Sequence, residues 1–124
     1  MADWHPLTAN TILYCRHWEE TVKFYGEDLA FPVNFSREGF VEFSLTETAR
    51  LTIADEKKAT IKSPEAKGIT LTLQVTGIDH VHRVLRDRGL EPTPVRAHAW
   101  NAEVFYLFDP EGHRIEFWEP LSRD

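Results

Sequence analysis

Apolar and polar residues alternate along several short segments of this chain, which is the pattern of β-strands with one buried face. In the segment NTILYC, Leu13 and Cys15 fall on one face, while Asn10, Ile12 and Tyr14 fall on the other. The same alternation predicts a hairpin and three further strands, at residues 39–55, 68–75, 103–108 and 114–120. We therefore expect a strand-rich fold in which each strand buries one side.

Helical spacing of apolar residues interrupts the strands in two places. The first helix is expected after residue 17, and its inward positions are Trp18, Val22, Tyr25 and Leu29. The second helix should direct Ile78, Val81 and Leu85 inward and end at Gly89. Thr76 and Asp79 resemble a capping box at the start of that helix.

The second half of the chain repeats the first at a constant offset of sixty residues. The aligned segments start at Thr11 and Leu71, and they match Leu13 with Leu73 without a gap. A unit of about fifty residues seen twice indicates two modules that bury their apolar faces together. We expect a single domain over residues 1–124, with a first module at about 8–56, a charged linker at about 57–67 and a second module at about 68–120.

Composition and charge narrow the class of protein. Hydrophobic residues make up 42% of the chain and charged residues 27%, as in ordinary soluble proteins. No apolar run is long enough to span a membrane, and the first ten residues lack a signal-peptide pattern, so we expect a cytoplasmic protein. A net charge of −6 argues against nucleic acid as a partner, and the single cysteine excludes an internal disulfide.

Two segments, FYGEDLAF and WNAEVFYLFDPEGHRIEFWEP, resemble those of the vicinal oxygen chelate superfamily. This superfamily includes glyoxalase I, bleomycin-resistance proteins and extradiol dioxygenases. The resemblance implies an α+β fold of two tandem βαβββ modules whose sheets form a cleft. It also implies a homodimer, in which modules pair either within one chain or between chains.

By the same resemblance, four strand positions would carry the family's metal ligands, usually His, Gln or Glu. In this sequence they fall on Asn10, Thr52, Thr70 and Glu116. An amide, two hydroxyls and one carboxylate form a poor ligand set for zinc, nickel or iron. We therefore expect no metal and no cofactor, although weak binding of a hard divalent cation at Glu116 stays open.

The cleft-facing side chains follow from the strand alternation and from the repeat. Besides the four positions above, they are Ile12, Tyr14, Glu42, Ser44, Thr72, Gln74, Arg114 and Trp118. His98 and Trp100 join them from the segment RAHAWN, which is predicted to be irregular and which overhangs the cleft in the family. Glu116 is the candidate catalytic base or ligand-pairing carboxylate, and Glu42 is either its acid partner or a solvated glutamate. His113 is expected to have a structural role in the DPEGH turn.

Flat apolar side chains mixed with a few hydrogen-bonding groups are typical of a small-molecule site. Two carboxylates, Glu42 and Glu116, accompany one arginine in this set, which favours a neutral or cationic aromatic ligand. The first interpretation is a metal-free binding protein that resembles the bleomycin-resistance branch. One alternative is a lyase, isomerase or dioxygenase relative that uses Glu116 or an atypical metal site including His98. Another is a dimeric interaction module with a vestigial pocket.

Overall fold

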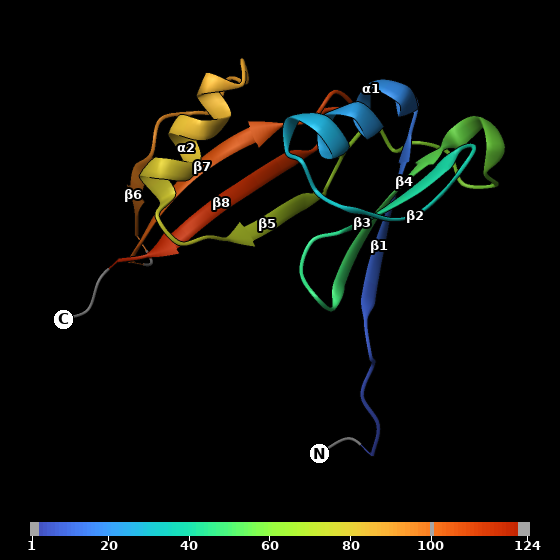
Figure 1. Cartoon of the computed structure of the whole chain (residues 1–124), viewed down its shortest axis with the longest axis horizontal. Coiled ribbons are helices and arrows are strands. Elements are labelled where there is room, and N and C mark those ends of the chain that lie inside the picture. Colours follow the sequence, from blue (N-terminus) through green and yellow to red (C-terminus); the bar gives the residue numbers. More distant parts are fainter. Residues whose placement is uncertain (1–2, 100, 122–124) are drawn as a thin grey trace. The chain divides into compact units, whose positions relative to one another are not determined.

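The computed structural model of the chain describes residues 3–99 and 101–121 (Figure 1). The chain divides into two compact units, unit 1 up to Glu65 and unit 2 from Ala66 onward. Each unit contains one four-stranded sheet and the same order of elements, a strand, a helix and three further strands. None of the described helices is long and apolar enough to cross a membrane.

Unit 1 orders its strands β1-β4-β3-β2, with β1 and β4 parallel and the other neighbours antiparallel. Its strands are β1 (Ala9–Cys15), β2 (Val33–Arg37), β3 (Phe40–Ser44) and β4 (Ala49–Asp55). Helix α1 (Trp18–Lys23) continues into the π-helical segment η1 (Phe24–Asp28), and a 3-10 turn, η2 (Glu56–Lys58), follows β4.

Unit 2 repeats this topology with strand order β5-β8-β7-β6, in which β5 and β8 are the parallel pair. Its elements are β5 (Thr70–Gln74), α2 (Ile78–Asp87), β6 (Arg96–His98), β7 (Ala102–Phe108) and β8 (Arg114–Pro120). The predicted α+β fold of two tandem βαβββ modules is confirmed.

The helix of each unit covers one face of its sheet, and the apolar side chains beneath it form the core. In unit 1, Tyr25 and Phe43 are fully buried with ring centroids 6.2 Å apart, and the Trp18 indole N–H donates to the Ile53 carbonyl at 2.9 Å. In unit 2, the rings of Phe105 and Phe117 stack at 4.7 Å. Burial of each such ring stabilises the fold by roughly 1.5–3 kcal/mol. The opposite face of each sheet, called here the open face, carries the polar residues of the strand alternation.

Two local predictions were wrong. The segment predicted to be irregular contains strand β6, which pairs with β7; its three residues are all exposed, so no apolar alternation marks it. The capping box is also absent, because the N-cap of α2 is Gly77, in a left-handed conformation with φ 73°. Instead, the Glu119 carboxylate accepts the backbone N–H groups of Gly77 and Ile78, each at 2.9 Å.

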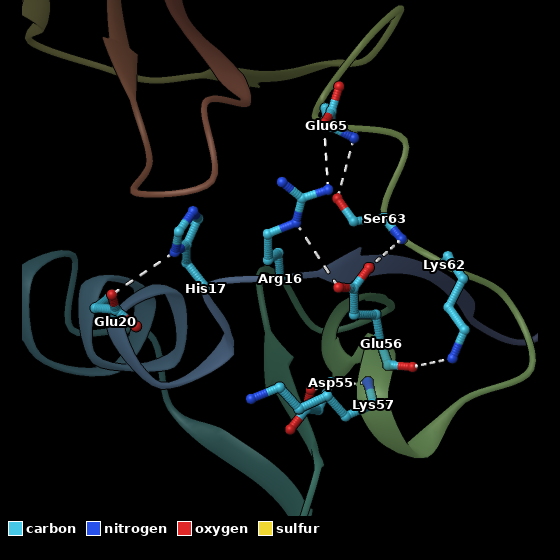
Figure 2. Close-up of polar contacts among 9 residues, drawn as sticks. All are labelled: Arg16, His17, Glu20, Asp55, Glu56, Lys57, Lys62, Ser63 and Glu65. Carbon is cyan, nitrogen blue, oxygen red and sulfur yellow. Dashed lines mark hydrogen bonds and ion pairs between the residues drawn. The ribbon is translucent and has the colours of Figure 1, made fainter.

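The first part of the linker is held against unit 1 by side-chain contacts around Arg16 (Figure 2). The Arg16 guanidinium donates to the Glu65 carboxylate at 3.2 Å and lies 3.8 Å from that of Glu56. Glu56 in turn accepts the Ser63 backbone N–H at 2.9 Å, and the Lys62 ammonium donates to the Glu56 carbonyl at 2.8 Å. One arginine therefore connects both ends of residues 56–65.

Candidate functional site

Strand register arranges the open face of each sheet into rows of side chains that run across the strands. In unit 1 the rows are Asn10–Arg50–Ser44, Ile12–Thr52–Glu42–Phe35 and Tyr14–Ala54–Phe40–Arg37. In unit 2 the equivalent rows are Thr70–Arg114–Phe108, Thr72–Glu116–Tyr106 and Gln74–Trp118–Val104–Arg96. The strand pairing therefore makes Thr52 and Glu116 equivalent positions of the two units.

In unit 1, several polar residues of the open face pair with one another. The buried Thr52 hydroxyl donates to the Asn10 side-chain oxygen at 3.0 Å. Glu42 accepts a hydrogen bond from the Asn34 amide, and the Arg50 guanidinium lies 3.7 Å from its carboxylate. Because both partners of this ion pair are mostly buried, Arg50 matches the charge of Glu42 within unit 1.

In unit 2, Glu116 lies at the centre of its row, between Thr72 and Tyr106. The Thr72 hydroxyl donates to the Glu116 carboxylate. Arg114 is directed to other groups: its Nε donates to the Thr70 hydroxyl at 3.2 Å, and its guanidinium lies 4.7 Å from the centroid of the Tyr106 ring. The Glu116 carboxylate thus lies on the open face with a hydrogen bond from Thr72.

Next to this row, strands β6 and β7 line a hollow of about 280 Å³, called here the β6–β7 hollow. Its lining residues are Thr93, Pro94, Arg96, Ala97, His98, Val104 and Tyr106. Tyr106 belongs both to the hollow and to the Glu116 row, so it joins the two. Trp118 pairs with Val104 in the neighbouring row, and Gln74 lies on the other side of Trp118. Trp100 lies outside the described residues.

The ligand set that the family would use for a metal does not fit one here. Asn10 and Thr52 bond to each other in unit 1, whereas Thr70 and Glu116 of unit 2 bond to Arg114 and Thr72. In the part of the chain that the structure describes, no three His, Cys, Asp or Glu side chains are grouped to hold a metal. An amide and hydroxyls already bonded within the protein are weak donors for a transition metal. That the four positions meet in one cleft stays a prediction.

Several residues of the open faces, among them Arg50, Tyr106 and Arg96, were absent from the predicted set. Arg50 lies two positions before Thr52, so strand alternation alone placed it on the same face. Tyr106 and Arg96 required the pairing of β7 with β8 and with β6, because neither belongs to the repeat alignment that revealed the other positions. Alternation within β4 was thus enough to identify Arg50, whereas Tyr106 and Arg96 depended on the register between strands.

The fold places the chain in the class of proteins built from two tandem βαβββ units, and each unit here has one open face that carries polar residues. A sequence profile of the Glyoxalase/Bleomycin resistance protein/Dioxygenase superfamily matches residues 7–117, and the chain belongs to this superfamily. No curated protein matches the chain at a significant level of sequence similarity.

Solved structures with the same fold have diverse names. A glyoxalase/bleomycin resistance protein/dioxygenase from Nocardioides is 21% identical with a TM-score of 0.81, over 100% of this chain and 89% of that one. TnmS3, an antibiotic binding protein from Streptomyces sp. CB03234, is 19% identical with a TM-score of 0.77, over 97% and 98%. A lactoylglutathione lyase from Agrobacterium tumefaciens is 13% identical with a TM-score of 0.75, over 95% and 96%. Likeness at these identities shows the fold, and this fold serves both binding proteins and enzymes.

Proposed function

We propose that this protein binds a small, flat, neutral or cationic aromatic molecule without a catalytic metal, and that the β6–β7 hollow and Glu116 form the contact in unit 2. The observation that carries the proposal is the adjacency of an apolar hollow to a carboxylate through one shared residue, Tyr106. Sites for small molecules combine apolar walls with a few placed polar groups.

The size and lining of the hollow favour a ligand with one or two fused rings. A volume of about 280 Å³ lies just below the range for small-molecule sites, which begins near 300 Å³, so only a small ligand would fit. Val104 and Pro94 supply apolar surface, Tyr106 supplies a ring, and His98 supplies a group that donates or accepts hydrogen bonds.

The cationic Arg96 lines the hollow, but the carboxylate of Glu116 beside it favours a ligand with a hydrogen-bond donor or a positive charge. Glu42 is paired with Arg50, so its negative charge is already matched and attracts a ligand only weakly. Glu116 has only a hydroxyl as its hydrogen-bond donor among the contacts above, while Arg114 is engaged with Thr70 and Tyr106. A charge-assisted hydrogen bond to such a carboxylate contributes roughly 1.5–3 kcal/mol.

The alternative of a lyase or isomerase relative also rests on Glu116, which would then act as a general base. The side chains around Glu116 favour the binding protein, because they do not include the imidazole and carboxylate ligands that hold a catalytic metal. The name of TnmS3, an antibiotic binding protein with this fold, supports a binding role as well. Elemental analysis of the purified protein distinguishes the two functions. One zinc, nickel or iron ion per chain that is lost in the Glu116→Gln variant would support the enzyme.

Three probes of one shape and different charge test the binding proposal: 2-naphthylmethylammonium, 2-naphthylmethanol and 2-naphthoate. Titration calorimetry should show that Glu116→Gln weakens binding of the ammonium about tenfold, with a smaller effect on the alcohol. Trp118→Ala should weaken binding of both, because the neighbouring indole supplies stacking area. Glu103→Gln is the matched control. Glu103 lies on β7, as Tyr106 does, but its side chain is on the helix-covered face of the sheet. The proposal fails if neither the ammonium nor the alcohol binds, or if Glu116→Gln binds the ammonium as tightly as the parent.

A further inference from the structure

We propose that the ligand of the β6–β7 hollow is a zwitterion with its two charges at opposite ends of an aromatic ring. Its positive end meets Glu116, and Arg96 binds a carboxylate at the other end. This inference rests on the proposed function and narrows the class of ligand at the same site. It adds Arg96 of β6 to the residues that determine specificity.

Two arginines lie on the open face of unit 2, and they differ in their contacts. Arg114 has partners within the protein, because it donates to the Thr70 hydroxyl at 3.2 Å and lies 4.7 Å from the centroid of the Tyr106 ring. Arg96 is exposed on β6 and lines the hollow. Among the residues that the structure describes, no carboxylate forms an ion pair with Arg96, and no aromatic ring lies against its guanidinium. Its positive charge is therefore available to a ligand.

The internal repeat shows that this unmatched cation is a feature of unit 2. In unit 1, Arg37 pairs with Phe40 across β2 and β3, and its guanidinium lies 5.1 Å from the centroid of the Phe40 ring. In unit 2, Arg96 pairs in the same way with Val104 across β6 and β7. Because valine has no ring, the cation–π contact of Arg37 has no counterpart at Arg96.

Strand register sets the distance between Arg96 and Glu116 on this face. Arg96 pairs with Val104 and Glu116 pairs with Tyr106, so β7 lies between the two charged residues. Two strand spacings of about 4.8 Å and a step of two residues along the strands place their Cα atoms roughly 12 Å apart. Arg96 and Glu116 do not form an ion pair with each other. A ligand between them therefore meets a carboxylate at one end and a guanidinium at the other.

This separation selects the arrangement of charges in the ligand. In an α-amino acid, the ammonium and the carboxylate are attached to one carbon atom, so they lie too close together to reach both residues. A benzene ring that carries the two groups at opposite positions extends across the strand between Arg96 and Glu116. A guanidinium presents parallel N–H groups that match a carboxylate bidentately, and a carboxylate accepts a charge-assisted hydrogen bond from an ammonium group.

Tyr106 provides the surface against which the ring of the ligand packs, because its side chain lines the hollow. Arg114 contacts the Tyr106 ring from the row of Phe108. Arg96 belongs to the row of Val104, on the other side of Tyr106 along β7. The part of the ring that Arg114 covers therefore lies away from the hollow. The rest of the ring is left for a flat ligand, since aromatic pairs pack offset or edge to face.

Titration calorimetry with three single-ring ligands tests this class: 4-(aminomethyl)benzoate, benzylammonium and phenylglycine. Benzylammonium lacks the carboxylate, and phenylglycine is an isomer of 4-(aminomethyl)benzoate whose two charged groups are attached to one carbon atom. We expect the parent protein to bind 4-(aminomethyl)benzoate about tenfold more tightly than either of the others. Arg96→Gln should remove this difference, whereas Arg37→Gln, the equivalent change in unit 1, should keep it. Because both arginines are exposed, the two variants should fold normally, which circular dichroism checks.

Three results would overturn the zwitterion: 4-(aminomethyl)benzoate that binds no more tightly than benzylammonium, phenylglycine that binds as tightly as 4-(aminomethyl)benzoate, or a tenfold difference that persists in Arg96→Gln. In each case, weaker binding of benzylammonium to Glu116→Gln than to the parent would show that the proposed function stands. No saturable binding of benzylammonium or of 4-(aminomethyl)benzoate up to about 1 mM, the weak end of specific affinity, would overturn the proposed function and the zwitterion together.

Discussion

At the scale of single residues, Glu119 shows how a side chain distant in sequence completes a helix. Hydrogen bonds from the backbone N–H groups of Ile78 and Gly77 lower the pKa of the Glu119 carboxyl below its ordinary value. The charged form is favoured in the folded protein, so its stabilising effect is present above the unfolded-state pKa and is lost as the pH falls through the lowered folded-state pKa.

We expect Glu119→Gln to lower the thermal midpoint at neutral pH and to reduce the loss of stability on acidification. Thermal melts at a series of pH values measure both effects, with Glu91→Gln as an exposed control. A variant that melts like the parent at every pH would show that the cap does not stabilise α2.

His113 is a second residue that holds a local structure together. It is buried with Asp109, its Nδ1 lies 2.8 Å from the Asp109 carboxylate, and that carboxylate also accepts three backbone N–H groups of the turn. The predicted role in the turn is thus confirmed. We expect His113→Ala to reduce the free energy of unfolding by about 2 kcal/mol or more, because it leaves a cavity and weakens the partners of a buried carboxylate.

Chemical denaturation measures this loss, and His80→Ala is the control, because the exposed His80 should change stability by less than about 0.5 kcal/mol. Equal unfolding free energies for the two variants would mean that the turn does not depend on the buried pair.

At the scale of elements, alternation and helical spacing predicted most strands and both helices because each buries one face. Strand β6 escaped prediction since a short edge strand with three exposed residues carries no alternation. The open-face residues of β1, β4 and β8 could be predicted from alternation, and the repeat led from Asn10 on β1 to Thr70 on β5. Those that depend on pairing between strands, such as the contact of Arg50 with Glu42, could not.

The linker gives a prediction at this same scale. Arg16→Gln should release residues 56–65 from the rest of unit 1, because Arg16 contacts the carboxylates of both Glu56 and Glu65. Hydrogen–deuterium exchange in this segment should rise, while global stability falls by no more than about 1 kcal/mol, since both contacts involve an exposed side chain. Lys23→Gln, which removes a surface ion pair with Glu27, should leave this exchange unchanged. Unchanged exchange in Arg16→Gln would show that other contacts hold the linker.

At the scale of the whole molecule, the repeat predicted the tandem fold because two similar patterns fold into similar units. The predicted homodimer stays a prediction. It gains a structural rationale from β2, an edge strand of unit 1 with exposed Val33 and Phe35 side chains. Sedimentation equilibrium should give about twice the chain mass of 14.4 kDa, and Val33→Lys should shift the population toward monomer. A parent protein that sediments as a monomer would contradict this expectation.

The central claim is that unit 2 binds a flat aromatic ligand at the β6–β7 hollow and Glu116. Amide chemical shifts of the isotopically labelled protein, followed during titration with 2-naphthylmethylammonium, test it most directly. We predict saturable shifts for Tyr106, Glu116 and His98, with the amides of α2 largely unchanged. Shifts confined to α2 or to the linker, or no saturable shifts at all, would contradict the claim.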